Sequence, residues 1–191
     1  MNILINIKDA LDEIEYRLSL RNFLGYKLTD FQYETLIAED DNQIVSYKRQ
    51  NRQEGTSLAL ILKVLKSVVY DCDKNDIIIF SRNNASAKIL KEKMLDIIYE
   101  NDLESLIESR TWPYIKFKFG VKIRFISCYG FNPNKIREAI KGLNINQIIY
   151  VDDFLHINTV NSTEMFLDEL LRINPKQIHL FIEGKENRSW N

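Results

Sequence analysis

The feature that most constrains the fold is a glycine-containing loop, residues 51–57, which lies between an apolar strand candidate and an apolar helix candidate. Such a loop aims backbone N–H groups and the positive end of the helix dipole at one point, where a phosphate group can bind. Far downstream, the apolar run 148–151 ends in Asp152 and Asp153. An aspartate after a buried strand can hold magnesium through its waters, and an adjacent acid can orient an attacking water. Together the two segments predict the halves of a nucleotide-triphosphate site.

One residue of the usual phosphate-binding loop is missing. Ser57 stands where a hydroxyl can reach a magnesium ion, but Thr56 occupies the position that usually carries lysine. A fixed cation near the β- and γ-phosphates is therefore absent from that position. We expect Arg52 or Lys48 to compensate by reaching across the loop, because basic side chains, and arginine above all, bind phosphate well.

Composition and charge narrow the class of protein. The chain has 191 residues, of which 45% are hydrophobic and 28% charged, so we expect one globular domain and neither a disordered nor a membrane protein. The net charge is −1, so any contact with nucleic acid must come from a local basic face. Cys72 and Cys128 have no short-spaced partner, which argues against a zinc cluster and for reduced thiols in the cytoplasm. We expect no signal peptide, because charged residues follow the first few positions, and no apolar run is long enough to span a membrane.

Apolar periodicity predicts alternating helices and strands. Helices are expected at residues 5–20, after a cap at Thr29 or Asp30, and at 58–70, 85–99, 134–141 and 163–173; strands are expected at 43–47, 76–81, 148–153 and 177–182. The strands at 43–47 and 76–81 read as buried. This order predicts an α/β fold with a mostly parallel sheet and active groups at the carboxyl ends of the strands.

Residues 115–125 have a different pattern. Every odd position is apolar, whereas the even positions are basic except for Gly120. Gly120 is a plausible bend, so two strands are expected in this segment, with one core face and one basic face. The basic residues Lys116, Lys118, Lys122 and Arg124 are candidates for binding DNA. Such a pattern is more often an ordinary solvated strand face than a nucleic-acid contact.

Several of these motifs occur in one order along the chain. They are Phe31-Gln32, Arg52-Gln53-x-Gly55-x-Ser57, the apolar strand 77–80, the alternating segment before Phe125, Lys141-Gly142-Leu143 and Ile149-Tyr150-Val151-Asp152-Asp153. This order resembles the ATPase domain of viral, bacteriophage-type DNA-packaging terminase large subunits, over roughly residues 22 to 184. The resemblance implies a P-loop NTPase-like (ASCE/RecA-like) fold, a mostly parallel sheet flanked by helices. It implies a single ATPase-like domain over 1–191, with an N-terminal helical segment at 1–25, a core at 26–191 and no residues left for the family's nuclease domain.

The resemblance also implies roles for individual residues, with ATP and Mg²⁺ as cofactors. Nucleotide binding falls to Phe31, Gln32, Arg52, Gln53, Glu54, Gly55, Thr56 and Ser57, the first two at the adenine. Metal binding falls to Ser57 and Asp152, and catalysis to Asp153 and Arg52. The sequence departs from the family pattern at Thr56, at Asp153 in place of glutamate, and at Lys141-Gly142 in place of Arg-Gly.

The function implied by the resemblance is an ATP hydrolase that couples hydrolysis to translocation of double-stranded DNA into a viral capsid. Its implied partners are duplex DNA, a portal protein and a small terminase subunit, in a ring when assembled and as a monomer in isolation, in the host cytoplasm and away from membranes. We expect Thr56 to make the activity weak or dependent on partners. Two alternatives stay open. One is a helicase-like ATPase lobe, and the other is a non-hydrolysing binding or assembly module with the P-loop fold.

Overall fold

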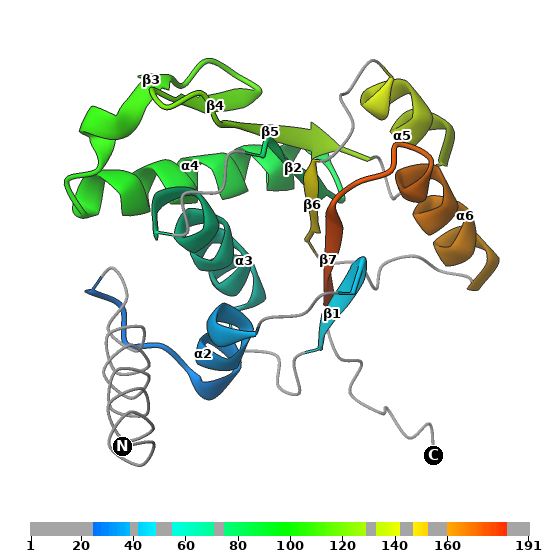
Figure 1. The fold of residues 1–191 in the computed structure, drawn as a ribbon, viewed down its shortest axis with the longest axis horizontal. Helices are drawn as coiled ribbons and strands as arrows, with labels where there is room; N and C mark the ends of the chain where they lie inside the picture. Colours follow the sequence, from blue (N-terminus) through cyan, green and yellow to red (C-terminus); the bar gives the residue numbers. More distant parts are fainter. Residues whose placement is uncertain are drawn as a thin grey trace, which may run out of the picture.

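The core of the chain is a seven-stranded sheet with the strand order β1-β7-β6-β2-β5-β4-β3 (Figure 1). The computed structural model describes residues 25–38, 42–48, 55–70, 75–128, 133–141, 147–152 and 160–182. The strands are β1 (Ile44–Lys48), β2 (Ile77–Ser81), β3 (Ile107–Ser109), β4 (Tyr114–Phe117), β5 (Lys122–Ser127), β6 (Ile148–Val151) and β7 (Gln177–Ile182). The pairs from β1 to β5 are parallel, while β4 and β3 are antiparallel additions at one end. The predicted mostly parallel α/β sheet is thus confirmed.

Helices cover both faces of this sheet. The chain runs from β1 to β2 through α3 (Thr56–Leu65) and from β2 through α4 (Asn84–Glu100), moving in one direction along the sheet. It returns from β5 to β6 through α5 (Pro133–Ile140) and from β6 to β7 through α6 (Val160–Leu171). Crossovers between parallel strands are right-handed, so this reversal of direction places α3 and α4 on one face and α5 and α6 on the other. The two pairs of helices lie on opposite sides of the sheet in Figure 1.

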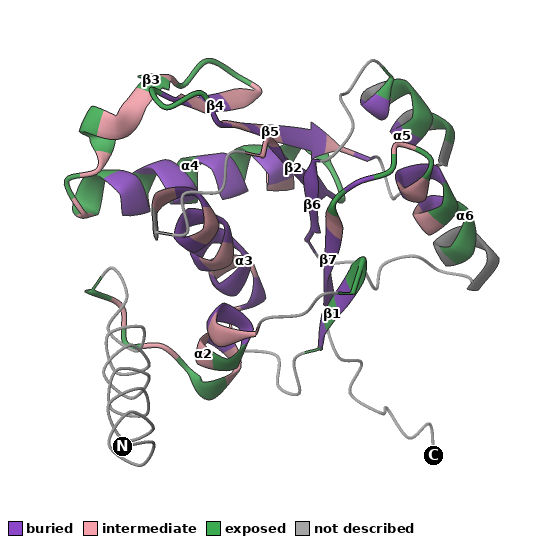
Figure 2. Cartoon of the chain, viewed as in Figure 1, coloured by how far each residue is buried: buried purple, intermediate pink, exposed green. Residues whose placement is uncertain are grey.

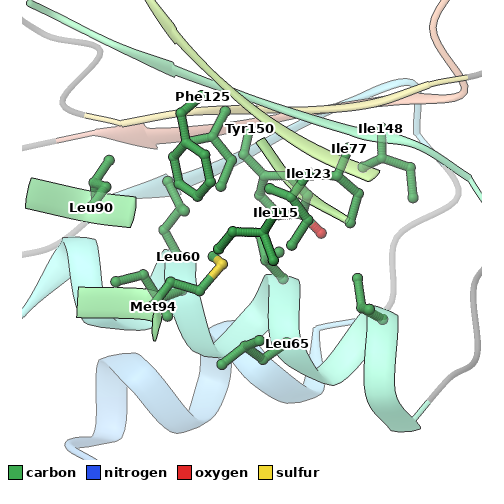
Figure 3. Packing of buried hydrophobic residues seen from close by; sticks show 14 of the residues in the cluster. Leu60, Leu65, Ile77, Leu90, Met94, Ile115, Ile123, Phe125, Ile148 and Tyr150 are labelled. Carbon is green, nitrogen blue, oxygen red and sulfur yellow. The ribbon is translucent and has the colours of Figure 1, made fainter. Parts of the chain in front are cut away.

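Each face has its own apolar core, and successive residues of β2 alternate between them. Ile77 and Ile79 pack with α3 and α4, whereas Ile78 and Phe80 pack with α5 and α6. Figure 3 shows part of the first core, where side chains of α3 and α4 meet those of four strands; the labelled residues are Leu60, Leu65, Ile77, Leu90, Met94, Ile115, Ile123, Phe125, Ile148 and Tyr150. Every residue of β2 and β6 is buried (Figure 2). The prediction of a central strand at 76–81 is therefore confirmed.

A smaller helix, α2 (Asp30–Ile37), packs on α3 through Leu36 and Leu62. Thr29 is its N-cap, so the expected start of this helix is confirmed. At its other end, the ammonium of Lys63 donates to the carbonyl of Ala38 at 2.6 Å. That contact satisfies one of the carbonyl groups beyond the last turn of α2 and fastens α2 to α3.

Some expectations need correction. The strand predicted as buried at 43–47 is the end strand β1, in which Val45 and Tyr47 are buried while Ile44, Ser46 and Lys48 are exposed. Val45 and Tyr47 belong to the core under α3 and α4, whereas the residues that alternate with them lie on the opposite face of the sheet. The helix expected at 58–70 begins at Thr56 and continues beyond Leu65 as a π-helical turn, Lys66–Tyr70. The short strand β3 was not expected, and it is preceded by a 3₁₀ turn, Glu104–Leu106.

The predicted bend in the alternating segment is confirmed. β4 and β5 form an antiparallel pair, and Gly120 lies between them with φ +99°. Residues 5–20, which were expected to form a helix, lie outside the described residues. Within the described part of the chain, no helix combines the length and apolar character needed to cross a membrane.

Candidate functional site

The candidate site begins at the first residue before α3. Gly55 is the N-cap of this helix and adopts a left-handed conformation, with φ +66° and ψ +51°. A Cβ atom at this position would lie 2.6 Å from Nε2 of Gln32, far inside normal contact distance. The left-handed backbone conformation therefore favours glycine, and a larger residue would also have to displace the end of the Gln32 side chain. The helix that follows directs its free N–H groups and positive dipole end toward this point.

Gln32 ties α2 to the glycine loop. Its Oε1 accepts from the Thr29 backbone N–H at 3.0 Å, and Thr29 Oγ1 accepts from the Gln32 backbone N–H at 3.3 Å, a reciprocal capping box. Its Nε2 donates to the carbonyl of Gly55 at 3.4 Å. Gln32 is only 4% exposed, and its neighbour Phe31 packs against the core beneath α3 and α4. The adenine contact implied for Phe31 and Gln32 remains a prediction, and the contacts of Gln32 connect two elements of the protein.

The second half of the site is the carboxyl end of β6. Ser57, in the first turn of α3, donates through Oγ to Oδ1 of Asp152 at 3.3 Å, across 95 residues of sequence. Asp152 follows β6 directly, is 7% exposed, and donates its backbone N–H to the carbonyl of Phe80 on β2 at 2.9 Å. The predicted metal ligands Ser57 and Asp152 thus lie in contact, although the strands that lead to them, β1 and β6, are separated by β7.

This pair has the chemistry that Mg²⁺ and a phosphate group require. Hydroxyl and carboxylate oxygens are hard ligands, and Mg²⁺ is usually held by one or two carboxylates together with waters and phosphate oxygens. Among the described residues, no group of three or more His, Cys, Asp or Glu comes together, so nothing there resembles a site built for a transition metal. The oxygen pair beside a helix N-terminus fits a magnesium–nucleotide complex.

Thr56 does not replace the missing lysine. It is 9% exposed, and its Oγ1 is buried with no hydrogen-bond partner among the described residues. A buried neutral hydroxyl supplies no positive charge to a phosphate. Of the two basic residues expected to compensate, Lys48 ends β1 and is exposed, while Arg52 lies outside the described residues.

Other predicted site residues also lie outside the described part. They are Gln53, Glu54 and Asp153, together with Gly142 of the Lys141-Gly142 motif. Their assigned roles remain predictions.

Cys128 is buried at the end of β5 as a free thiol, and burial raises its pKa well above the ordinary value, so it stays protonated.

A polar network that the sequence did not indicate runs beneath the site. Tyr47 Oη and His179 Nδ1 lie 3.0 Å apart, and the rings of His179 and Tyr150 stack with centroids 4.6 Å apart. All three residues are buried, on β1, β7 and β6 respectively. They join the strand before the glycine loop to the strand before Asp152. Nothing in the local sequence marks them, because their meeting depends on strand order.

The basic residues of the alternating segment lie on the sheet face away from α4. Lys122 and Arg124 both lie over the ring of Tyr114, with their charged groups 5.4 and 5.7 Å from its centroid. Lys116 forms an ion pair with Glu108 at 2.7 Å, and Lys118 is exposed in the turn after β4. The structure therefore contains the predicted basic residues, and three of the four have contacts within the protein. These contacts are compatible with a solvated strand face and with a DNA-binding surface.

Comparison with solved structures places this geometry among known folds. The ATPase domain of the large terminase of Thermus phage P74-26, in its original form and as an arginine-to-alanine variant, aligns with a TM-score of 0.59 at 14% identity, over 89% of this chain and 70% of that one. The large terminase of bacteriophage HK97 aligns with a TM-score of 0.60 at 11% identity, over 83% of this chain and 33% of that one.

The chain has the fold of a phage large-terminase ATPase domain. The resemblance drawn from the motifs is therefore confirmed at the level of fold. No protein-family model and no curated protein sequence matches the chain. With identities of 11–14%, the likeness lies in the arrangement of strands and helices and leaves the chemistry of individual residues to be argued from the site.

Proposed function

We propose that the chain is the ATPase motor domain of a DNA-packaging terminase, which couples ATP hydrolysis to translocation of duplex DNA into a viral capsid. The observation that carries the proposal is the contact between Ser57 Oγ and Asp152 Oδ1. It joins the helix N-terminus suited to phosphate and the strand-end carboxylate suited to magnesium, in a fold shared with terminase ATPase domains. Neither half alone would favour hydrolysis.

In this proposal, the backbone N–H groups at the start of α3 bind the phosphates, and Gly55 allows the close approach. Ser57 and Asp152 hold Mg²⁺, which when bound neutralises charge on the β- and γ-phosphates. Asp153 orients or deprotonates the attacking water. Arg52 supplies the charge that Thr56 does not, because a guanidinium can contact two phosphate oxygens at once.

The proposed partners follow from the same role. Duplex DNA is the polymer moved, a portal protein and a small terminase subunit complete the assembly, and a ring of copies forms around the DNA. Lys118, Lys122 and Arg124 are the proposed DNA contacts, since they are cations on a part of the sheet that α4 does not cover. Lys116 is the weakest candidate, because Glu108 already neutralises it.

A second candidate is a non-hydrolysing module with the same fold. The burial of Thr56 favours it, since the loop position that normally holds a cation holds a buried hydroxyl. A helicase-like lobe is a third possibility and predicts stimulation by single-stranded rather than duplex DNA. Turnover separates the three: a motor hydrolyses ATP with duplex DNA, a helicase lobe prefers single strands, and the module releases no phosphate.

The test is ATP turnover by the unaltered chain and by Asp152→Ala, with duplex or single-stranded DNA present. We expect duplex-stimulated phosphate release that falls at least about a thousandfold in Asp152→Ala, because a bound metal contributes several kcal/mol to phosphoryl transfer. Asp168→Ala is the matched control, since Asp168 is exposed on α6. Equal turnover in Asp152→Ala and the control would remove Asp152 from the mechanism.

A further inference from the structure

A second polar position lies beside Asp152 on the neighbouring strand. Phe80 of β2 pairs with Val151 of β6, so the next residue, Ser81, is level with Asp152. The ladder continues at this point, because Asp152 N–H donates to the Phe80 carbonyl at 2.9 Å. Adjacent strands are about 4.8 Å apart, which places the Ser81 backbone within one side chain and one water of Asp152.

Ser81 also points to the same side of the sheet as Asp152. Alternation along β2 puts Ile77 and Ile79 in the core under α3 and α4, and Ser81 continues that series. Along β6, Ile148 and Tyr150 belong to the same core, and Asp152 continues theirs. The contact between Asp152 and Ser57 of α3 confirms which side this is.

The hydroxyl of Ser81 is an unusual group to bury. Ser81 is 0% exposed, and its Oγ has no hydrogen-bond partner among the described residues. A buried hydroxyl without a partner destabilises a folded protein, and such groups in native structures call for an explanation. A ligand that completes the site explains it, since Mg²⁺ keeps several of its waters when it binds to carboxylates.

We propose that Ser81 is a positioning residue of the nucleotide site, whose hydroxyl binds the water shell of the metal ion held by Asp152. This inference rests on the proposed function, because it needs a magnesium–nucleotide complex at Asp152. The hydroxyl bonds a water rather than the ion itself, so it orients the complex and takes no part in bond making.

Ser127 supplies a matched control. It pairs with Ser81 across β2 and β5, and its Oγ is likewise buried without a partner among the described residues. It lies one strand farther from Asp152, beyond the reach of a single bridging water. The two hydroxyls are thus alike in being buried without a partner among the described residues, and they differ in their distance from the metal site.

The experiment measures binding of a non-hydrolysable ATP analogue by calorimetry, with Mg²⁺ and with EDTA, together with the melting temperature without ligand. We expect Ser81→Ala to melt roughly 2–4 °C higher, because an unpartnered buried hydroxyl is gone, and to bind the magnesium complex roughly tenfold more weakly. Binding in EDTA should not change. Ser127→Ala should also melt higher yet keep full affinity, and Ser81→Thr, which retains the hydroxyl, should keep the affinity.

Three results would overturn the inference. They are unchanged magnesium-dependent affinity in Ser81→Ala, equal weakening in Ser127→Ala, or equal weakening with EDTA. If Ser81→Thr does not fold, the comparison of the two alanine variants decides alone. An Asp152→Asn variant separates this inference from the proposed function. If Asp152→Asn loses binding while Ser81→Ala keeps full affinity, only the role of Ser81 is removed. If the unaltered chain does not bind the nucleotide, both the role of Ser81 and the proposed function are removed.

Discussion

The two faces of the sheet end differently at its carboxyl edge. On the face covered by α5 and α6, the last inward residues of neighbouring strands, Phe80, Ile126 and Val151, are apolar and buried. The next residue of each strand lies on the face of α3 and α4 and is polar. These residues are Ser81, Ser127 and Asp152. At these strand ends only the face of α3 and α4 is polar, and it is so beside the helix N-terminus. The contrast teaches that the face of α5 and α6 is built for packing and the face of α3 and α4 for a ligand.

The strongest way to break this comparison is to substitute Phe80, the neighbour of Ser81 on the packing face. Phe80 is fully buried and meets Phe166 edge to face, with ring centroids 6.3 Å apart. We expect Phe80→Ala to lower the free energy of unfolding by roughly 3–5 kcal/mol. Urea denaturation measures this loss. Nucleotide affinity below the melting transition should not change, and a selective loss of affinity at full stability would contradict the division between the faces.

A second substitution tests how tightly the ligand face is built around the glycine loop. Gly55→Ala forces a side chain into a left-handed conformation and against Gln32, so we expect it to destabilise the protein by about 1–3 kcal/mol. Combining it with Gln32→Ala removes the clash but not the backbone strain. The double variant should therefore be more stable than the sum of the two single changes predicts, in a double-mutant cycle by thermal unfolding. Strict additivity would show that Gln32 does not press on the loop.

Much of this architecture could be predicted from the sequence, because it depends on local pattern. The run at 77–80 is apolar throughout and forms the central strand, and the alternation on either side of Gly120 is that of a hairpin with one buried face. Thr29 and Gln32 stand at capping-box spacing at the start of α2. Ser57 and Asp152 could be predicted for the same reason. Ser57 lies at the start of an apolar helix and Asp152 at the end of an apolar strand.

What the sequence could not supply depends on which strands are neighbours. β1 reads as buried, yet it lies at the end of the described sheet, and three residues of β3 are too few to show any period. Ser81 is an ordinary serine until β2 is known to pair with β6 in the register that brings it level with Asp152. The stack of Tyr150 on His179 depends in the same way on the neighbouring position of their strands.

The basic residues of β5, on the sheet face opposite to α3 and α4, give a third test. Lys122 and Arg124 alternate with core residues on β5 and lie over Tyr114. If they contact DNA phosphates, Lys122→Gln with Arg124→Gln should weaken duplex binding uniformly across sequences and reduce the salt slope by about two. Filter binding over a range of salt concentrations measures this. Lys93→Gln with Lys88→Gln, on exposed positions of α4, is the control pair. An unchanged slope would leave the basic residues as a solvated strand face.

The smallest effect is expected between the helices of the packing face. Arg137 of α5 hydrogen-bonds Glu169 of α6 and holds the pKa of that carboxyl below its ordinary value, with Arg172 adding to the effect. A lowered pKa in the folded state stabilises the protein above the unfolded pKa, and that stability is lost as the pH falls through the folded value. Glu169→Gln should therefore flatten the fall in stability below about pH 4.5. The change should be small, since solvent screens the exposed arginines. Acid titration of the unaltered chain and of Glu169→Gln by circular dichroism tests this prediction. Identical curves would show that the ion pair does not contribute to stability.

The central claim is that Ser57 and Asp152 form one magnesium–nucleotide site. The most direct test is calorimetric binding of a non-hydrolysable ATP analogue with Mg²⁺ to four proteins: the unaltered chain, Ser57→Ala, Asp152→Asn and the double variant. We predict micromolar binding by the unaltered chain, a loss in each single variant, and a double variant little worse than Asp152→Asn alone, because the two side chains serve one ion. No magnesium-dependent binding at millimolar nucleotide, or affinity unchanged in Asp152→Asn, would contradict the account.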